Sequence, residues 1–162
     1  MYLLLIIVNN SNGEIMKIKD IMSKNIISCK LNSTIYDVSK LMKKYNIGFI
    51  PIIDNGLKGV ITDRDIVIKC IYNKDNNLYG YINNNVIYID DDNDISDALL
   101  LMNKYKIKRL IVKNKKEIVG ILSLSDILNY NVDNNFIDTI KSIYEIKDNN
   151  INDNNEIDDF YL

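Results

Sequence analysis

The sequence predicts an α+β fold made of two copies of one β-α-β-β-α unit, and two repeated stretches are the main reason. Residues 59–65 read Gly-Val-Ile-Thr-Asp-Arg-Asp, and residues 120–126 return 61 positions later as Gly-Ile-Leu-Ser-Leu-Ser-Asp. Residues 41–47, Leu-Met-Lys-Lys-Tyr-Asn-Ile, match Leu-Met-Asn-Lys-Tyr-Lys-Ile at 101–107. A repeat this regular indicates a duplicated structural unit. With 162 residues, of which 47% are hydrophobic, the chain can form one domain or two half-domains that share a core.

The first copy, residues 16–72, is expected to contain a short strand, a helix, a hairpin and a second helix. The predicted elements are, in order, a strand over 26–28, a helix over 34–45, strands over 49–53 and 57–61, and a helix over 63–71. The first helix has its apolar residues on one face, and Asn32 to Thr34 offer N-caps for it. Asn46 can end the helix, and Asp54-Asn55-Gly56 is a strong hairpin signal.

The second copy, residues 79–131, repeats this order after an Asn- and Asp-rich linker over 73–78. The predicted elements are a strand over 86–88, a helix over 95–105, strands over 109–112 and 117–122, and a closing helix over 123–130. Acidic residues over 90–94 favour the start of the first of these helices. One extra residue in the second hairpin changes the offset between the copies from 60 to 61.

The repeated signature places a hydroxyl and a carboxylate where a strand runs into a helix. Thr62 ends the strand, so its hydroxyl lies at a helix N-terminus, where backbone N–H groups and the helix dipole favour a phosphate or another anion. Asp65 lies one turn further and can accept hydrogen bonds from two vicinal hydroxyls, as a ribose presents them. Gly59 suits a position where another backbone passes closely. The signature also fits a capping box, and the residues alone leave both roles open.

Composition argues against most catalytic and metal-dependent classes of protein. The chain has no histidine, which excludes histidine-based acid–base catalysis and leaves little for a zinc or haem site. Cys29 and Cys70 lack redox or metal-binding spacing and are expected to be buried thiols in a reducing cytoplasm. The net charge of −2 is far from the positive balance of a nucleic-acid-binding surface. We therefore expect no catalytic residue, no metal site and no nucleic-acid partner.

Three stretches lie outside the repeat. Residues 1–15 open with eight apolar residues, too few to span a bilayer, so no membrane partner is expected. They are interpreted as an added strand, as an extension upstream of a start at Met16, or as a segment that docks on a membrane or partner. Residues 132–147 predict an additional amphipathic helix that covers the module, joins a dimer or docks a partner. Residues 148–162 predict a disordered acidic tail.

The order of elements and both signatures resemble a tandem pair of cystathionine-β-synthase-type (CBS) domains in a stand-alone protein of the bacterial type. The similarity runs from Ile18 to Tyr130, and its most specific parts are Gly-h-x-Thr/Ser-x-x-Asp in both copies and Asp-Ile-Met at 20–22. The resemblance implies that the copies pack through their sheets into one pseudo-symmetric module. Such modules usually dimerise as a flat disc and bind adenosine-containing ligands in clefts between the copies.

The resemblance also implies where an adenine ring would lie. One slot is expected near residues 26–28 and Pro51, and the other near residues 86–88. Ile111 departs from the family, which commonly has a proline at that position, so the shape of the second slot stays open.

Basic residues are the expected phosphate contacts. Lys108 and Arg109 resemble residues that approach ligand phosphates in the family, and Arg64 lies beside the first signature. A planar guanidinium suits bidentate phosphate binding, but a salt bridge with Asp63 or another acid is the alternative. The full predicted ligand-binding set is Ile27, Ser28, Pro51, Ile61, Thr62, Arg64, Asp65, Ile87, Tyr88, Lys108, Arg109, Leu122, Ser123 and Asp126.

The sequence therefore predicts a cytoplasmic regulatory module that senses an adenosine ligand and signals to a partner protein. The expected ligand is AMP, ADP, ATP or S-adenosylmethionine, no cofactor is expected, and the expected assembly is a homodimer. An enzyme is the second class of function, but the chain lacks a nucleophile–base pair, a metal cluster and a phosphate loop. The third class is a structural dimerisation module whose pockets are vestigial.

Overall fold

The structure, a computed structural model, describes residues 15–74, 76–129 and 143 of the chain. The first copy contains α2 (Ile35–Tyr45), β1 (Phe49–Ile53), β2 (Leu57–Thr62), α3 (Asp63–Asp65) and the π-helix η1 (Ile66–Ile71). The second copy contains β3 (Tyr88–Asp90), α4 (Ile95–Tyr105), β4 (Arg109–Asn114), β5 (Glu117–Ser123) and α5 (Leu124–Leu128). The short helix α1 (Ile18–Ile21) lies at the start of the first copy, and the 3-10 helix η2 (Tyr79–Tyr81) lies at the start of the second.

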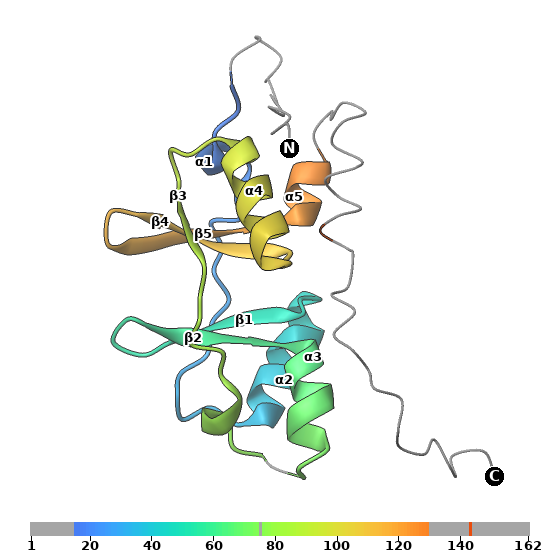
Figure 1. The fold of residues 1–162 in the computed structure, drawn as a ribbon. Coiled ribbons are helices and arrows are strands. Elements are labelled where there is room, and N and C mark those ends of the chain that lie inside the picture. The colour runs from blue at the N-terminus through green and yellow to red at the C-terminus, as the bar shows by residue number, and fades with distance from the viewer. Residues whose placement is uncertain (1–14, 75, 130–142, 144–162) are drawn as a thin grey trace, which may run out of the picture.

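The two copies pack through their sheets. Strands β1 and β2 form an antiparallel pair, whereas β3, β4 and β5 form a mixed sheet in which β3 runs parallel to β4. In Figure 1 the two sheets lie next to each other in the middle of the molecule, and α2 and α4 lie on opposite outer sides. The predicted α+β architecture of two sheet-packed repeats is confirmed.

Local signals in the sequence produce the predicted helices and turns. Thr34 caps α2, because its side-chain oxygen accepts a hydrogen bond from the Asp37 N–H at 3.1 Å. Asn46 ends α2 in the left-handed conformation, with φ of 52°. At the tip of the first hairpin, Asn55 and Gly56 have φ values of 50° and 99°. Positive φ at two successive residues is the turn geometry that Asn-Gly favours.

One predicted strand is wrong. Residues 26–28 form no strand, and in that part of the first copy only Cys29 makes an isolated parallel bridge, with Ile52. In the second copy β3 does form, but it starts at the last residue of the predicted strand over 86–88. The physical reason is that an apolar pattern indicates burial without showing whether the backbone pairs with a neighbouring strand.

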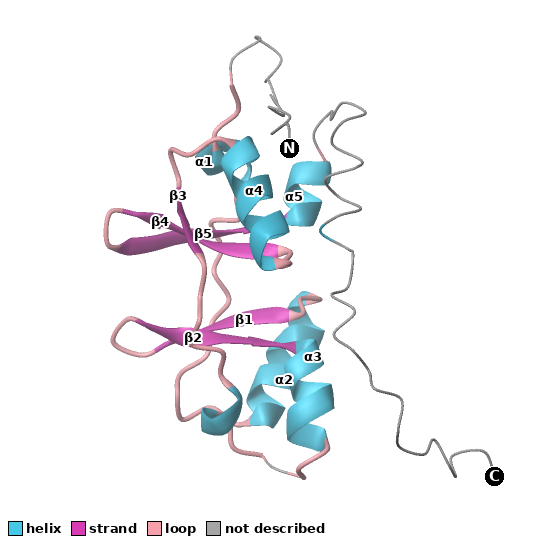
Figure 2. Cartoon of the chain, in the orientation of Figure 1, coloured by secondary structure: helices cyan, strands magenta, loops and turns pink. Residues whose placement is uncertain are grey.

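Each copy is completed by the segment that leads into the other copy. Leu78, just ahead of the second copy, is fully buried in the core of the first. Met16 and Ile18, at the start of the first copy, are buried in the core of the second. Figure 2 shows in pink the loops that connect the two halves of the molecule. The leading segments of the two copies are therefore exchanged.

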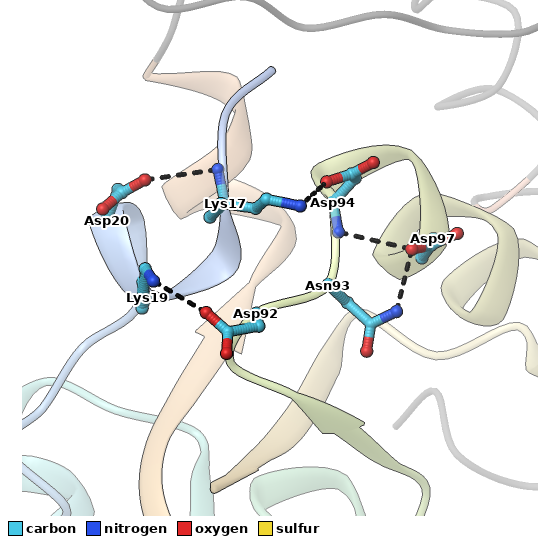
Figure 3. Close-up of polar contacts among 7 residues, drawn as sticks. All are labelled: Lys17, Lys19, Asp20, Asp92, Asn93, Asp94 and Asp97. Carbon is cyan, nitrogen blue, oxygen red and sulfur yellow. Dashed lines mark hydrogen bonds and ion pairs between the residues drawn. The ribbon is translucent and has the colours of Figure 1, made fainter. Parts of the chain in front are cut away.

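Polar contacts hold α1 on the N-terminal end of α4 (Figure 3). Lys17 Nζ lies 2.6 Å from Asp94 Oδ1, and Lys19 Nζ lies 2.7 Å from Asp92 Oδ1. The Asp94 N–H donates to the Asp97 carboxylate at 3.3 Å, as a capping interaction of α4. Asp94 therefore takes part both in the capping of α4 and in the ion pair that anchors α1.

Gly59 in β2 and Gly120 in β5 let the exchanged segments pass close to the sheets. The two glycines hold equivalent positions in the repeat. A Cβ at Gly120 would lie 2.9 Å from the carbonyl oxygen of Ser23, and one at Gly59 would lie 2.6 Å from that of Asn83. Both separations are shorter than a carbon–oxygen contact allows, so the predicted close backbone approach at Gly59 is confirmed and recurs at Gly120.

Predictions for the two ends of the chain fall mostly outside the described residues. These predictions are the extension over 1–15, of which only Ile15 is described, and the tail over 148–162. Of the predicted helix over 132–147 only Ile143 is described, and its side chain is 3% exposed within the core of the second copy. No helix among the described residues is long and apolar enough to cross a bilayer.

Candidate functional site

At each of the two corners where a repeated strand runs into a helix, a cleft opens between the copies. The first cleft, of about 390 Å³, is bordered by Thr62 to Arg64 of one signature and by residues 85–87 and 106–109 of the second copy. The second cleft, of about 300 Å³, is bordered by residues of the other signature and of the first copy, namely Ser123, Ser125, Asp126, Asn25, Ile27, Asn46 and Ile47. Both volumes lie in the range of small-molecule sites.

The repeat relates the two clefts residue by residue. Thr62 in the first cleft corresponds to Ser123 in the second, and Ile87 corresponds to Ile27. Each cleft combines the signature of one copy with the leading segment of the other copy. Neither cleft could therefore form from a single copy of the unit.

At the first corner the carboxylate of Asp65 is fully engaged. One oxygen accepts hydrogen bonds from the Thr62 N–H at 3.1 Å and the Thr62 hydroxyl at 2.6 Å, and the other accepts from the Lys69 ammonium at 2.7 Å. Burial raises the pKa of Asp65, but hydrogen bonds from Lys69 and Thr62 outweigh it and hold the pKa below its usual range. Asp65 does not border the first cleft. The predicted capping role is confirmed here, and the carboxylate has no oxygen left over.

At the second corner the carboxylate of Asp126 keeps one oxygen available. Its Oδ2 accepts from the Ser123 N–H at 2.7 Å and from the Ser123 hydroxyl at 2.6 Å. Its Oδ1 has no hydrogen bond or ion pair with any residue that the structure describes, and Asp126 borders the second cleft. The position equivalent to Lys69 holds Tyr130, which carries no ammonium group. The two corners thus share a cap but differ in what they offer a ligand.

The two clefts also differ in charge. The first is bordered by four basic side chains and one acidic one: Arg64, Lys106, Lys108, Arg109 and Asp63. Among the charged residues that the structure describes, the second is bordered by Arg109 and Asp126 alone. Neither arginine forms a salt bridge with a carboxylate of the described part of the chain, and Asp63 instead accepts a hydrogen bond from the Arg64 backbone N–H at 2.8 Å. The first cleft therefore favours an anion more strongly than the second.

The structure brings most of the predicted site residues to the clefts. The first cleft is bordered by Thr62, Arg64, Ile87, Lys108 and Arg109, and the second by Ile27, Arg109, Ser123 and Asp126. Asp65 lies behind Thr62 at the first corner. Besides Asp65, five predicted residues border neither cleft: Ser28, Pro51, Ile61, Tyr88 and Leu122. Of these, Ile61 and Leu122 are fully buried in the two cores.

Sequence reasoning missed Val60, which borders the first cleft in place of Ile61. Side chains alternate between the two faces of a strand, so Val60 shares the face of Thr62 and Ile61 points into the core. The same alternation over 121–123 puts Ile121 at the second cleft. The sequence therefore contained the signal, because Val60 and Ile121 each stand two positions before a corner hydroxyl.

Phe49 was also missed, although it borders both clefts. It holds the position equivalent to Arg109, sixty residues earlier, and aligning the two copies would have identified it. The guanidinium carbon of Arg109 lies 5.9 Å from the centre of the Phe49 ring. The predicted phosphate contact thus lies beside its own counterpart from the other copy, near the outer limit of a cation–π contact.

The two cysteines lie outside both clefts. Cys29 and Cys70 are buried free thiols, and burial raises the pKa of Cys29 although a hydrogen bond with Ser33 acts in the opposite direction. In the region that the structure describes, no group of three His, Cys, Asp or Glu residues could hold a metal ion. The residues at the clefts are suited to binding a polar, partly anionic ligand through hydrogen bonds and charge.

Comparisons with known proteins show the same doubled unit. A family model for the CBS domain matches residues 18–72 and 78–133. The chain is 31% identical over 114 residues to the CBS domain-containing protein YhcV of Bacillus subtilis (strain 168), covering 68% of this chain and 81% of that protein. It is 30% identical to the inosine-5'-monophosphate dehydrogenase of Methanocaldococcus jannaschii over 69% of this chain but only 23% of that enzyme.

A solved structure gives the same result at the level of the fold. It is the CBS domain pair of protein MJ0100 in complex with 5'-methylthioadenosine and S-adenosyl-L-methionine. The two chains superpose with a TM-score of 0.66 at 31% identity, over 71% of this chain and 94% of the other.

Proposed function

Because this chain belongs to the CBS domain family, we propose that it is a regulatory module that binds an adenosine ligand and reports the level of that ligand to a partner protein. The proposed ligand class is AMP, ADP, ATP or S-adenosylmethionine. The complex of the MJ0100 domain pair with two adenosine compounds supports this class.

The observation that carries the proposal is the open carboxylate oxygen of Asp126 at the mouth of the second cleft. A ribose presents two neighbouring hydroxyl donors, and an ionised carboxylate accepts such hydrogen bonds more strongly than a neutral group. Ile27, Ile47 and Ile121 supply apolar wall beside it, as an adenine ring needs. In this arrangement the sugar binds Asp126 and the base lies against the isoleucines.

In the first cleft the proposed ligand contacts are mainly to phosphate. The hydroxyl of Thr62 and the side chains of Arg64 and Lys108 border this cleft. Charge-assisted hydrogen bonds from arginine and lysine suit phosphate oxygens. Asp65 does not border this cleft and its Oδ1 already accepts from Lys69, so a ribose contact with that oxygen would compete with the ion pair.

The proposed role is regulatory and not catalytic. In the inosine-5'-monophosphate dehydrogenase relative, the similar stretch is 23% of the enzyme, so most of that protein has no counterpart here. A steady release of product from a panel of adenine nucleotides would contradict this part of the proposal.

The proposed assembly is a homodimer formed through η1. Four apolar side chains in or next to this helix are each more than half exposed: Val67, Ile68, Ile71 and Tyr72. An apolar patch of this kind is typical of an interaction surface. Light scattering is expected to give a dimer for the full chain and a monomer for Ile71→Glu. A monomeric full chain at micromolar concentration would remove the dimer from the proposal.

The test of ligand binding is a thermal-shift and calorimetric screen with AMP, ADP, ATP and S-adenosylmethionine. A ligand that binds only the folded state at a hundred times its Kd should stabilise the chain by about 2.7 kcal/mol. If none of the four raises the melting temperature, the structural dimerisation module becomes the better assignment.

Two matched variants test the role of the corner carboxylates. Asp126→Asn keeps an oxygen for the Ser123 cap but removes the charged acceptor, so it is expected to weaken binding about tenfold or more. Asp65→Asn makes the same change at the corner where Lys69 already holds the carboxylate, so a smaller effect is expected. Equal losses in both variants would argue against the ribose assignment to Asp126.

A further inference from the structure

We propose that Arg109 couples the two clefts, because one guanidinium serves both and two phosphorylated ligands must compete for it. The inference rests on the proposed binding of adenosine ligands and adds a rule for how the two sites interact. Binding of a phosphorylated ligand in the first cleft should weaken binding of a second such ligand in the other cleft.

Arg109 and Phe49 form the shared wall between the clefts. Of the described residues that border either cleft, these two alone border both. Phe49 is the first residue of β1 and Arg109 the first residue of β4. Any movement of either side chain therefore changes both clefts at once.

The strand register places this wall directly beside both corners. Phe49 pairs with Thr62 across β1 and β2, and Arg109 pairs with Ser123 across β4 and β5. Each wall residue thus stands opposite the corner hydroxyl of its own copy. A guanidinium at this position is within reach of a phosphate at either corner.

The side chain of Arg109 is held loosely enough to move. It is half-buried, and its guanidinium carbon lies 5.9 Å from the Phe49 ring, near the outer limit of a cation–π contact. Within the described residues it forms no salt bridge with a carboxylate. A charge-assisted hydrogen bond to phosphate is stronger than such a contact, so a bound phosphate should capture the guanidinium.

The unequal charge of the clefts gives the coupling its direction. Without Arg109 the first cleft still has three basic side chains, whereas Asp126 is then the only charged residue of the described chain that borders the second. A phosphate near that carboxylate would then be repelled. The second cleft therefore depends on Arg109 for phosphate binding, and occupancy of the first cleft removes it.

The experiment is an NMR titration of the full chain with ADP, in which the amide signals of Thr62 and Ser123 follow the first and second clefts separately. The variant Arg64→Gln/Lys108→Gln weakens phosphate binding at two residues that border only the first cleft. Since Arg109 is then no longer shared, ADP affinity at the second cleft is expected to rise at least fivefold. An unchanged or lower affinity there would overturn the coupling.

Two controls identify the guanidinium as the cause. In an Arg109→Met background the same double substitution should leave ADP affinity at the second cleft unchanged, and a fivefold gain there would also overturn the proposal. Adenosine carries no phosphate, so its affinity at the second cleft should not respond to the double substitution. If ADP bound at neither cleft of the unmodified chain, ADP would drop out of the proposed ligand class and the coupling would fall with it, whereas independent binding at both clefts would remove only the coupling.

Discussion

Lys17 and Asp94 form an ion pair with a nitrogen–oxygen distance of 2.6 Å, although they are 77 positions apart in the chain (Figure 3). The contact ties the segment that leads into the first copy to the N-terminus of α4 in the second copy. It is the polar counterpart of the burial of Met16 and Ile18 in the second core. The exchange of leading segments therefore has both an apolar and a charged component.

Lys17→Met is expected to lower the free energy of unfolding by roughly 0.5–1 kcal/mol, as for a partly exposed ion pair. The side chains of Lys17 and Asp94 are 42% and 29% exposed, so the pair is partly screened by solvent. Urea denaturation at low and high salt measures the effect, which should shrink as salt increases. Lys19→Met is the matched control, because its partner Asp92 is 73% exposed and a smaller loss is expected. Equal losses in both variants would contradict this ranking.

Gly120→Ala is expected to destabilise the chain by about 1–3 kcal/mol, the usual cost of forcing extra atoms into a packed site. The added carbon would press on the Ser23 carbonyl oxygen where the exchanged segment crosses β5. Thermal denaturation measures the loss. Gly80→Ala is the control, since no atom lies within 4 Å of the Cβ position there. A Gly120→Ala protein as stable as Gly80→Ala would show that the crossing is not tight.

Asp65→Asn is expected to reduce the amount by which the free energy of unfolding falls as the pH is lowered. The folded-state pKa of Asp65 is below its unfolded value of about 3.9, so the ionised carboxylate stabilises the fold above that value. That contribution disappears as the pH falls through the folded-state pKa, and asparagine removes it at every pH. Urea denaturation between about pH 3 and pH 7 gives the slope. Asp54→Asn serves as the control, and an equal change of slope in both variants would contradict the role of the Lys69 and Thr62 contacts.

Neither cysteine is expected to react with a thiol reagent at pH 8 while the chain is folded. Cys29 is 6% exposed and Cys70 is fully buried, and burial raises the pKa of Cys29, which keeps that thiol protonated. A colorimetric thiol titration should find no rapidly reacting group in the native chain and two in urea. Rapid reaction of either group in the native chain would show that its part of the core opens.

Much of the fold could be predicted from the sequence because the signals are local. The cap at Thr34, the left-handed residue Asn46 and the Asn55-Gly56 turn depend on their immediate neighbours. The strand predicted over 26–28 failed because strand pairing depends on a partner far away in the chain. The apolar residues there have another role, because Ile27 is half-buried and borders the second cleft.

The clefts were only partly predictable. The corner hydroxyls and Asp126 could be found because the repeated signature marks them in the sequence, whereas Lys108 and Arg109 were predicted from the family resemblance. We predicted that Ile61 and Leu122 border a cleft, but both side chains are buried in a core. Because side chains alternate along a strand, the residues that share the face of a corner hydroxyl stand two positions before it. Phe49 could not be singled out by residue type, because a phenylalanine at the start of a strand is usually a core residue.

By itself, the sequence determined that one unit occurs twice and that each copy ends a strand at a capped hydroxyl, since caps, turns and apolar periodicity act over a few residues. Only the tertiary structure decided that Met16 completes the second copy, that Leu78 completes the first, and that Arg109 meets Phe49. The physical reason is that these contacts join distant parts of the chain. Such contacts arise from the packing of two whole cores against each other and not from the preferences of any short segment.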